Sequence, residues 1–180
     1  PFTIEIMINV NKNWQQSRIQ PRRDPLAIDL DGDGIETLGI NSTNPVLFDH
    51  DFDGVKTGTG WLKGDDAWLV LDRDKNGAID SGRELFGVDT LISKTVPSST
   101  PGGAATVVTR NAVNGFDALS SLDSNSDKVF NALDAEFANV RLWQDLNQDG
   151  ISQATELASL SGKGITAISL VPTSAKPAPG

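Results

Sequence analysis

Short apolar runs followed by aspartate-rich loops recur along most of the chain. The apolar runs lie at 26–28, 46–48, 68–71, 119–122 and 140–143. The loops that follow them begin at Asp29, Asp49, Asp72, Asp123 and Asp145. The same pattern returning about every 20 residues, with one longer gap, is typical of a structural repeat. It predicts one module of short apolar elements joined by similar loops.

The segments outside this repeat are assigned from their own patterns. Strict alternation at 2–10 predicts a half-buried strand within a leader, residues 1–24. Residues 25–171 form the predicted module. Its long gap, 92–114, is rich in Ser, Thr, Pro and Gly and predicts a flexible insertion with a weak strand at 106–109.

The end of the chain predicts the few helices of the fold. Apolar spacing favours a helical segment at 133–143, a short helix at 154–160 and a closing strand at 165–171. The tail, 172–180, is expected to be disordered. Together these elements predict an α+β, calcium-stapled domain of short strands, EF-hand-like loops and short helices.

Charge and composition exclude several classes of partner and of metal site. Asp and Glu outnumber Lys and Arg by 24 to 15, which argues against nucleic acid and anionic membranes. There is no Cys, so thiolate metal sites and disulfides are excluded. No apolar stretch approaches the roughly 20 residues of a transmembrane helix. Because the chain begins with Pro and shows no signal peptide, we expect it to be a segment of a longer protein.

The clustered acids point to a cation, and calcium is the ion their spacing suits. Calcium takes six to eight oxygen ligands, supplied in such loops by positions 1, 3 and 5, the carbonyl at position 7 and an acid at position 12. The predicted ligands are Asp29, Asp31, Asp33, Asp49, Asp51, Asp53, Asp72, Asp74, Asn76, Asp80, Glu84, Asp123, Asn125, Asp127, Asp134, Asp145, Asn147, Asp149, Ile151 (carbonyl) and Glu156. Crowded carboxylates repel without a cation, so ion binding and folding are expected to be one event.

The five loops fit the calcium pattern to different degrees. The loop from Asp145 fits throughout, with Gly at position 6 and Glu156 at position 12. The loop from Asp123 has Asp134 at position 12, but Lys128 replaces the Gly and predicts a strained or altered turn. In the loop from Asp72, Glu84 falls at position 13, which implies a one-residue bulge.

The loops from Asp29 and Asp49 have no acid at position 12. They must take further ligands from elsewhere, and Glu36, Asp65 and Asp66 are candidates for this. A single loop of this kind is equally well read as an Asx-turn on the surface. Five in one chain favour calcium.

A second chemistry is available at the bond between Asp24 and Pro25. The Asp24 carboxylate can attack its own main-chain carbonyl, forming a five-membered cyclic anhydride and expelling the Pro25 nitrogen. Intramolecular attack of this kind benefits from effective molarities of about 10⁵ M or more. Asp29 lies five residues on, roughly 15 Å along an extended chain, so calcium is expected to organise the fold rather than activate the carbonyl directly.

These motifs, in this order, resemble the self-processing module of FrpC-type iron-regulated RTX proteins. The resemblance covers about residues 24–171. It is carried by Asp-Pro-Leu-Ala-Ile-Asp-Leu-Asp-Gly-Asp-Gly-Ile-Glu (24–36), Phe-Asp-His-Asp-Phe-Asp-Gly (48–54), Leu-Asp-Arg-Asp-Lys-Asn-Gly (71–77), Glu-Leu-Phe-Gly (84–87) and Leu-Trp-Gln-Asp-Leu-Asn-Gln-Asp-Gly (142–150).

The resemblance implies calcium-triggered, single-turnover cleavage at Asp24–Pro25, with possible isopeptide ligation of the released Asp24 end to a Lys-bearing acceptor protein. It implies calcium ligation by Asp123, Asp134, Asp145 and Glu156, and type I secretion into calcium-rich surroundings. Two features depart from the family pattern, namely the long insertion at 92–114 and Lys128.

Other classes of function fit parts of the same pattern. A calcium-dependent structural, adhesion or dockerin-like binding module would use the loops without cleaving anything. A calmodulin-like sensor would need long helices beside each loop. A hydrolase acting on other molecules is the weakest alternative, because His50, the only histidine, lies inside a predicted calcium loop.

Overall fold

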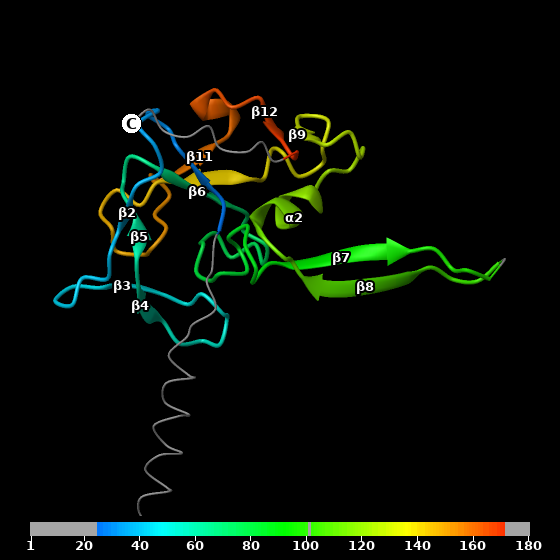
Figure 1. Cartoon of the computed structure of the whole chain (residues 1–180), viewed down its shortest axis with the longest axis horizontal. Helices are drawn as coiled ribbons and strands as arrows, with labels where there is room; N and C mark the ends of the chain where they lie inside the picture. The colour runs from blue at the N-terminus through cyan, green and yellow to red at the C-terminus, as the bar shows by residue number, and fades with distance from the viewer. Residues whose placement is uncertain (1–24, 101, 172–180) are drawn as a thin grey trace, which may run out of the picture.

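The computed structural model describes residues 25–100 and 102–171, and it consists mainly of short antiparallel strands (Figure 1). The strands are β1 Ala27–Ile28, β2 Thr37–Leu38, β3 Val46–Phe48, β4 Thr57–Thr59, β5 Trp61–Leu62, β6 Ala67–Val70, β7 Leu91–Val96, β8 Thr106–Asn111, β9 Val129–Asn131, β10 Arg141–Trp143, β11 Leu157–Ser159 and β12 Ala167–Ser169. The predicted strand at 2–10, the leader, Asp24 and the tail lie outside the described residues.

A four-stranded sheet in the order β1-β6-β10-β11 lies at the centre of the module. Trp68 on β6 pairs with Ala27 on β1 and with Trp143 on β10, and both pairings are antiparallel. All four residues of β6 are buried. A strand buried on both faces reads as a continuous apolar run rather than an alternating one, which is the pattern of 67–70.

The two faces of β6 serve two separate apolar cores. Ala67 and Leu69 face a core that also contains Phe86 and Leu142, against which Leu26 and Ile28 pack. Trp68 and Val70 face a second core. In that second core the Trp61 ring lies edge-on to the rings of Trp68 and Trp143, with centroids 5.5 and 5.4 Å away. Such aromatic pairs contribute about 0.5–1.5 kcal/mol each beyond the apolar area they bury.

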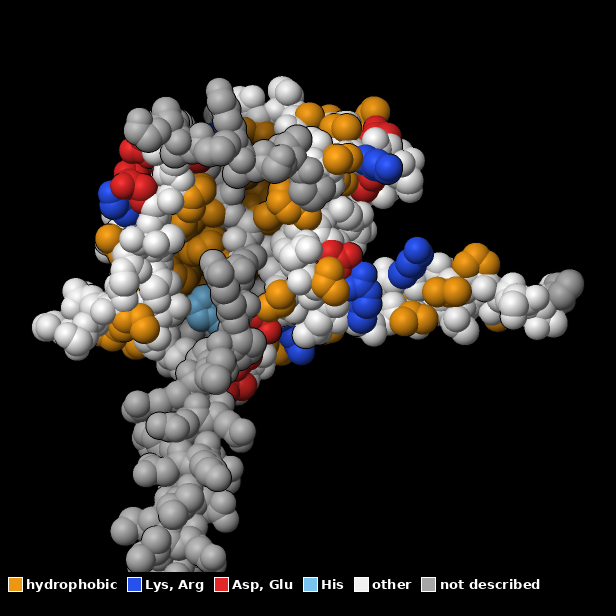
Figure 2. All heavy atoms as spheres, viewed as in Figure 1, with side chains coloured by type: hydrophobic (Ala, Val, Ile, Leu, Met, Phe, Trp, Pro, Cys, Tyr) orange, Lys and Arg blue, Asp and Glu red, His pale blue; other side chains and the backbone are white. Residues whose placement is uncertain are grey.

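Four two-stranded sheets surround this centre, namely β2-β5, β3-β4, β7-β8 and β9-β12. The β7-β8 ribbon projects from the body of the module (Figure 1) and carries apolar and basic side chains along its visible face (Figure 2). Its strands occupy much of the segment predicted as an insertion, and β8 covers the weak strand expected at 106–109. β12 lies within the strand expected at 165–171.

The predicted α+β class, with helices beside calcium loops, is wrong. In the described residues the helices are α2 Gly115–Ser120, capped by the Asn114 side chain, and the 3-10 turn η1 Ser161–Lys163. α2 ends shortly before the loop from Asp123, but no helix directly follows that loop in the described residues, so the helix–loop–helix arrangement of an EF-hand is not formed there. None of the helices in the described ranges has the length and apolar character needed to cross a membrane.

Both mispredicted helices are turns that run into strands. Residues 133–143 form turns followed by β10, and residues 154–160 form turns followed by β11. Leu133 is 75% exposed, so the apolar spacing that suggested a helix does not define one buried face. Pairing of β10 with β6 and β11 is the competing interaction, and local periodicity carries no information about it.

The two-sided burial of β6 predicts where truncation harms the fold. Leu69 is fully buried, whereas Leu47 is 45% exposed. Leu69→Ala should lower the free energy of unfolding by about 2–5 kcal/mol through lost transfer energy and a cavity. Leu47→Ala should change it by less than about 1 kcal/mol. Urea denaturation in excess calcium measures both, and equal losses would contradict the central place of β6.

Candidate metal centres and the segment at Pro25

All five aspartate-rich loops follow the same backbone path. The residue at position 4 has a positive φ in every loop: Gly32 (90°), Phe52 (61°), Lys75 (61°), Ser126 (61°) and Gln148 (56°). Position 6 does the same: Gly34 (107°), Gly54 (85°), Gly77 (87°), Lys128 (67°) and Gly150 (70°). Lys128 therefore keeps the turn in the left-handed region, at a cost of about 1–2 kcal/mol for a residue with a Cβ. The repeat seen in the sequence is a repeat of backbone conformation.

The first aspartate of each loop closes that loop on itself. Its carboxylate accepts a hydrogen bond from the N–H at position 6. The bonds are Gly34 to Asp29 (3.1 Å), Gly54 to Asp49 (2.9 Å), Gly77 to Asp72 (2.9 Å), Lys128 to Asp123 (3.0 Å) and Gly150 to Asp145 (2.8 Å). Charge-assisted bonds of this kind are stronger than neutral ones. They hold the position 1 carboxylate in one orientation.

Three acids predicted to close the ligand shell fold back onto their loops. Glu84, Asp134 and Glu156 are all buried. Each accepts a hydrogen bond from the N–H at position 2 of its loop. The donors are Arg73 to Glu84 (3.2 Å), Ser124 to Asp134 (2.8 Å) and Leu146 to Glu156 (3.0 Å). Glu84 thus plays the same part as the other two although it stands at position 13.

Three groups of acids are close enough together to hold a metal ion. Within each group, one carboxylate oxygen from every residue lies within 4.8 Å of the others. The groups are Asp29, Asp31 and Asp66; Asp49, Asp51 and Asp53; and Asp72, Asp74 and Glu84. Two oxygens bound to one calcium ion are separated by at most about 5 Å, so the spacing fits a single ion in each group.

The remaining predicted ligands lie near these groups or in the two later loops. Asn76 donates through its side-chain nitrogen to Asp74 (3.0 Å) and Asp80 (3.1 Å). Asp33 is outside its group, and its N–H donates to Asp31 (3.3 Å). The hydrogen bond between the side chains of Asp33 and Asp31 raises the pKa of Asp33.

The loops from Asp123 and Asp145 bring no three acidic oxygens this close within the described part of the chain. Both have Asn at position 3, where an amide oxygen replaces a carboxylate, and Asn147 donates to Asp149 (2.9 Å). Ile151, whose carbonyl was assigned as a ligand, donates its N–H to Asp149 (2.8 Å). Assignment of individual residues as calcium ligands stays a prediction.

Asp66 joins a group that loop spacing alone does not identify. It stands more than 30 residues beyond the start of the loop from Asp29, and only its acidity made it a candidate. Its neighbour Asp65 is exposed and belongs to none of the three groups. Asp66 is buried whereas Asp65 is exposed, and the sequence carries no signal of this difference because both acids precede the same strand.

Burial raises the proton affinity of two acids in the loops. Burial raises the pKa of Glu84 to about 7, against an ordinary value of 4.5, although the N–H groups of Asp80 and Arg73 oppose the shift. Burial likewise raises the pKa of Asp145. Both carboxylates are therefore costly to ionise when no cation is bound.

Close contacts connect the loops to one another. The Gly82 N–H donates to the Asp49 carbonyl (2.8 Å), and a Cβ at Gly82 would lie 1.9 Å from the His50 carbonyl oxygen. The Ile79 N–H donates to the Ser152 hydroxyl (2.6 Å), which joins the loop from Asp72 to the loop from Asp145. A Cβ at Gly150 would lie 2.9 Å from the Leu47 carbonyl oxygen. A change in the conformation of one loop is therefore transmitted by direct contact to the next loop.

Pro25 lies against the segment that follows Glu84. The Leu26 N–H donates to the Phe86 carbonyl (2.8 Å), and the Leu69 N–H donates to the Leu26 carbonyl (2.9 Å). A Cβ at Gly87 would lie 3.3 Å from the Cα of Pro25. Pro25 also lines a small pocket with His50, Leu85 and Asp89. Asp24, the predicted nucleophile, lies outside the described residues.

The raised pKa of Glu84 predicts how pH acts on the cation-free protein. Between its ordinary pKa and about 7, the folded protein holds a proton on Glu84 that the unfolded chain has released. This contribution to stability is complete below about pH 4.5 and is lost as pH rises through about 7. The raised pKa of Asp145 acts in the same direction.

In excess chelator, the folded fraction of the protein should therefore fall between about pH 5 and pH 8. Glu84→Gln should flatten part of that slope, and saturating calcium should remove it for the wild type, because in the proposed ion-bound state Glu84 is ionised in both the folded and the unfolded chain over this range. Circular dichroism at several pH values measures each slope. An undiminished slope in Glu84→Gln would show that Glu84 is not its source.

Comparison with known proteins places the chain in a family. Residues 26–178 match the SPM domain. The iron-regulated protein FrpA of Neisseria meningitidis serogroup C is 48% identical over 147 residues, which is 82% of this chain. The chain spans only 12% of the length of that relative. The chain belongs to the SPM domain family, the FrpC-type module that its motifs resemble.

Proposed function

We propose that this module binds calcium and, once folded around it, cleaves its own peptide bond between Asp24 and Pro25. The observation that carries the proposal is the short path from a candidate metal ligand to Pro25. Glu84 belongs to the acidic group of the loop from Asp72, and Phe86 and Gly87, just beyond it, contact Leu26 and Pro25. Ion binding at that loop therefore bears on the residues that follow the bond.

The chemistry requires only the side chain of Asp24 and water. A carboxylate oxygen of Asp24 attacks the main-chain carbonyl carbon of the same residue, and a C–O bond forms as the C–N bond to Pro25 breaks. The Pro25 nitrogen takes a proton from water and becomes the new amino terminus. Because Pro makes this amide tertiary, its planarity is more easily lost than that of other peptide bonds.

The cyclic anhydride left on Asp24 then has two fates. Water opens it to a free carboxyl-terminal aspartate. A neutral lysine Nζ of an acceptor protein opens it to a new amide and leaves a carboxylate behind. The same anhydride thus accounts for cleavage and for isopeptide ligation.

The fold contributes to the proposed cleavage by holding Pro25 and the residues after it in place. Leu26 is held by its hydrogen bonds to Phe86 and Leu69, and Pro25 packs against Gly87. Holding the residues after the bond limits the geometries open to the bond itself, which raises the fraction of attack-competent conformers. Calcium is the proposed organiser of that arrangement, with no direct contact to the reacting carbonyl.

The proposed setting is extracellular. The relative FrpA is an iron-regulated protein, and the FrpC-type resemblance implies type I secretion. Millimolar calcium outside the cell would then supply the trigger after export. The proposed partner for ligation is a lysine-bearing protein.

Replacing Asp24 should separate cleavage from calcium binding. Asp24→Asn removes the nucleophilic carboxylate but lies outside all five loops, so cleavage should stop while calcium binding persists. Mass spectrometry of the wild type after calcium addition should find fragments that end at Asp24 and begin at Pro25. With added Nα-acetyl-lysine, part of the first fragment should carry one acetyl-lysine through an amide. Cleavage at full rate in Asp24→Asn would leave the calcium-dependent binding module as the better function.

A methyl group placed against Pro25 should slow cleavage without removing any acid. The Cβ of Gly87→Ala would lie 3.3 Å from the Pro25 Cα, which is tight enough to force a shift. A shift of a few tenths of an ångström at the reacting bond should slow cleavage by about tenfold. Gly39→Ala is the matched control, because its Cβ would have nothing within 4 Å. Equal rates in the two variants, followed by gel electrophoresis after calcium addition, would argue against docking of Pro25.

A further inference from the structure

Asp66 is a buried acid with an unsatisfied oxygen. It is 2% exposed, and its Oδ2 accepts a hydrogen bond from the Glu36 N–H (2.8 Å). Its Oδ1 is buried and has no hydrogen-bond partner in the described parts of the chain. A buried carboxylate oxygen without a partner is costly, so this oxygen calls for a ligand.

The oxygens facing Asp66 come from the loop that begins at Asp29. One carboxylate oxygen each of Asp29, Asp31 and Asp66 lies within 4.8 Å of the other two. The Asp29 carboxylate is already oriented by the N–H groups of Gly32 (2.7 Å) and Gly34 (3.1 Å). Three carboxylates this close repel one another unless a cation lies among them.

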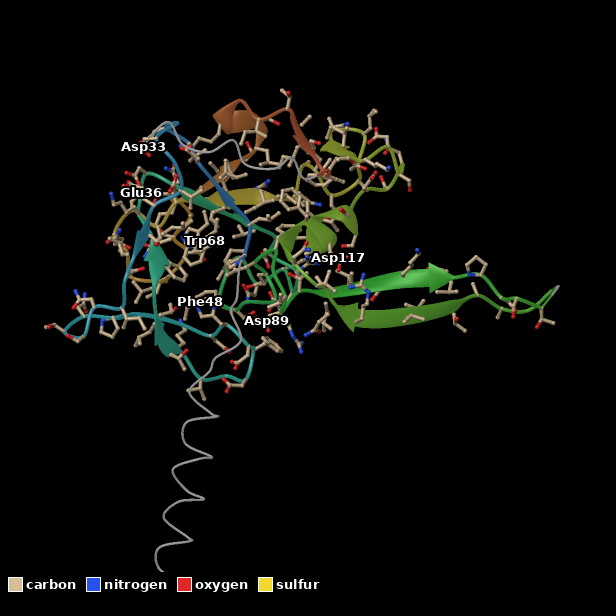
Figure 3. The ribbon with its side chains drawn as sticks, in the orientation of Figure 1. Asp33, Glu36, Phe48, Trp68, Asp89 and Asp117 are labelled. Carbon is tan, nitrogen blue, oxygen red and sulfur yellow. The ribbon has the colours of Figure 1, made fainter. Side chains whose placement is uncertain are left out.

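Lys63 is paired with an acid outside the three aspartates. Lys63 donates to Glu36 (2.6 Å), and the hydrogen bond to Glu36 raises the pKa of Lys63. Figure 3 labels Glu36 and Asp33, which lie together at the corner of the molecule where the chain turns after β1. The charge of the three aspartates is thus left for a metal ion to balance.

We propose that Asp66 completes a divalent-cation site with Asp29 and Asp31 and that the bound ion clasps β1 to β6. The oxygens are hard ligands at the spacing of a single calcium shell, so calcium is the ion that suits the site. Asp66 takes the place of the acid that the loop lacks at position 12. The site itself does not depend on cleavage, whereas its effect on cleavage rests on the proposed function.

The strand register explains how an ion at this site would affect the pairing of β1 with β6. Ile28 pairs with Ala67 and Ala27 pairs with Trp68, so Asp29 and Asp66 directly follow and precede the last pair of the ladder. β1 has only two residues. An ion shared by Asp29 and Asp66 extends that short pairing, whereas repulsion between them opposes it. Ion occupancy therefore controls whether the segment that carries Pro25 stays docked.

The test compares two neighbouring aspartates in a chain that stays whole. In the Asp24→Ala background, Asp66→Asn removes a charge from the site while keeping the shape of the side chain. Asp65→Asn makes the same charge change at an exposed position outside the site. Native mass spectrometry in a calcium titration should find one ion fewer in Asp66→Asn than in Asp65→Asn.

Hydrogen exchange measures the stability of the pairing between β1 and β6 separately from the number of ions bound. In calcium, the amides of Leu26 and Leu69 should exchange roughly tenfold faster or more in Asp66→Asn than in Asp65→Asn. The Leu170 amide, which donates to Lys128 at 2.9 Å, should not change. Equal ion counts and equal exchange in both variants would overturn the proposal.

A second variant guards against a general loss of folding. Asp31 is exposed, and Asp31→Ala, which leaves no oxygen at that position, should lose the same ion and the same amide protection while the Leu170 amide stays protected. If Asp31→Ala keeps the ion, the site is not the one proposed. If the variants behave as expected but the wild-type chain does not cleave in calcium, the clasp stands and the proposed function fails.

Discussion

The hydrogen bond from the N–H at position 6 to the carboxylate at position 1 is the interaction on which the rest of this structure depends. It recurs in all five loops at 2.8–3.1 Å. Regular elements are short here, since the longest strands in the described residues have six residues. Strands of two or three residues cannot hold a chain path alone. The loops therefore act as the rigid parts of the module, and the strands link them.

Direct contacts between the loops couple the conformation of each loop to that of its neighbours. Gly82 admits the His50 carbonyl at a distance that no side chain would allow, and Ser152 bonds Ile79 across a sequence separation of 73 residues. In the proposed calcium-bound state, the ion relieves repulsion among the acids of a loop, and the contacts between loops transmit that preference to the next loop. Under the proposed function, binding energy at a loop far from Pro25 in sequence is thereby available to the segment that Pro25 begins.

Much of this arrangement was predictable from the chain, because the loop pattern is local. Spacing of Asp and Gly within a few residues specifies the turn, and the positive φ at Lys128 follows from its place at position 6. The helices at 133–143 and 154–160 were wrong because Glu156 bends back to bond Leu146 and β10 pairs with β6. Asp66 could not be assigned from spacing, since a strand pairing brings it to Asp29.

The pairing of β6 also sets the order in which the module can assemble. Its neighbours β1 and β10 lie far from it on opposite sides in the sequence, so the central sheet is built from long-range contacts. Folds dominated by such contacts pay a large loop-closure entropy and fold slowly. The central sheet is complete only when β1, β6 and β10 are all present in the folding compartment. Without β10 the second aromatic core lacks Trp143, so the start of the module is loosely held until its last third has arrived.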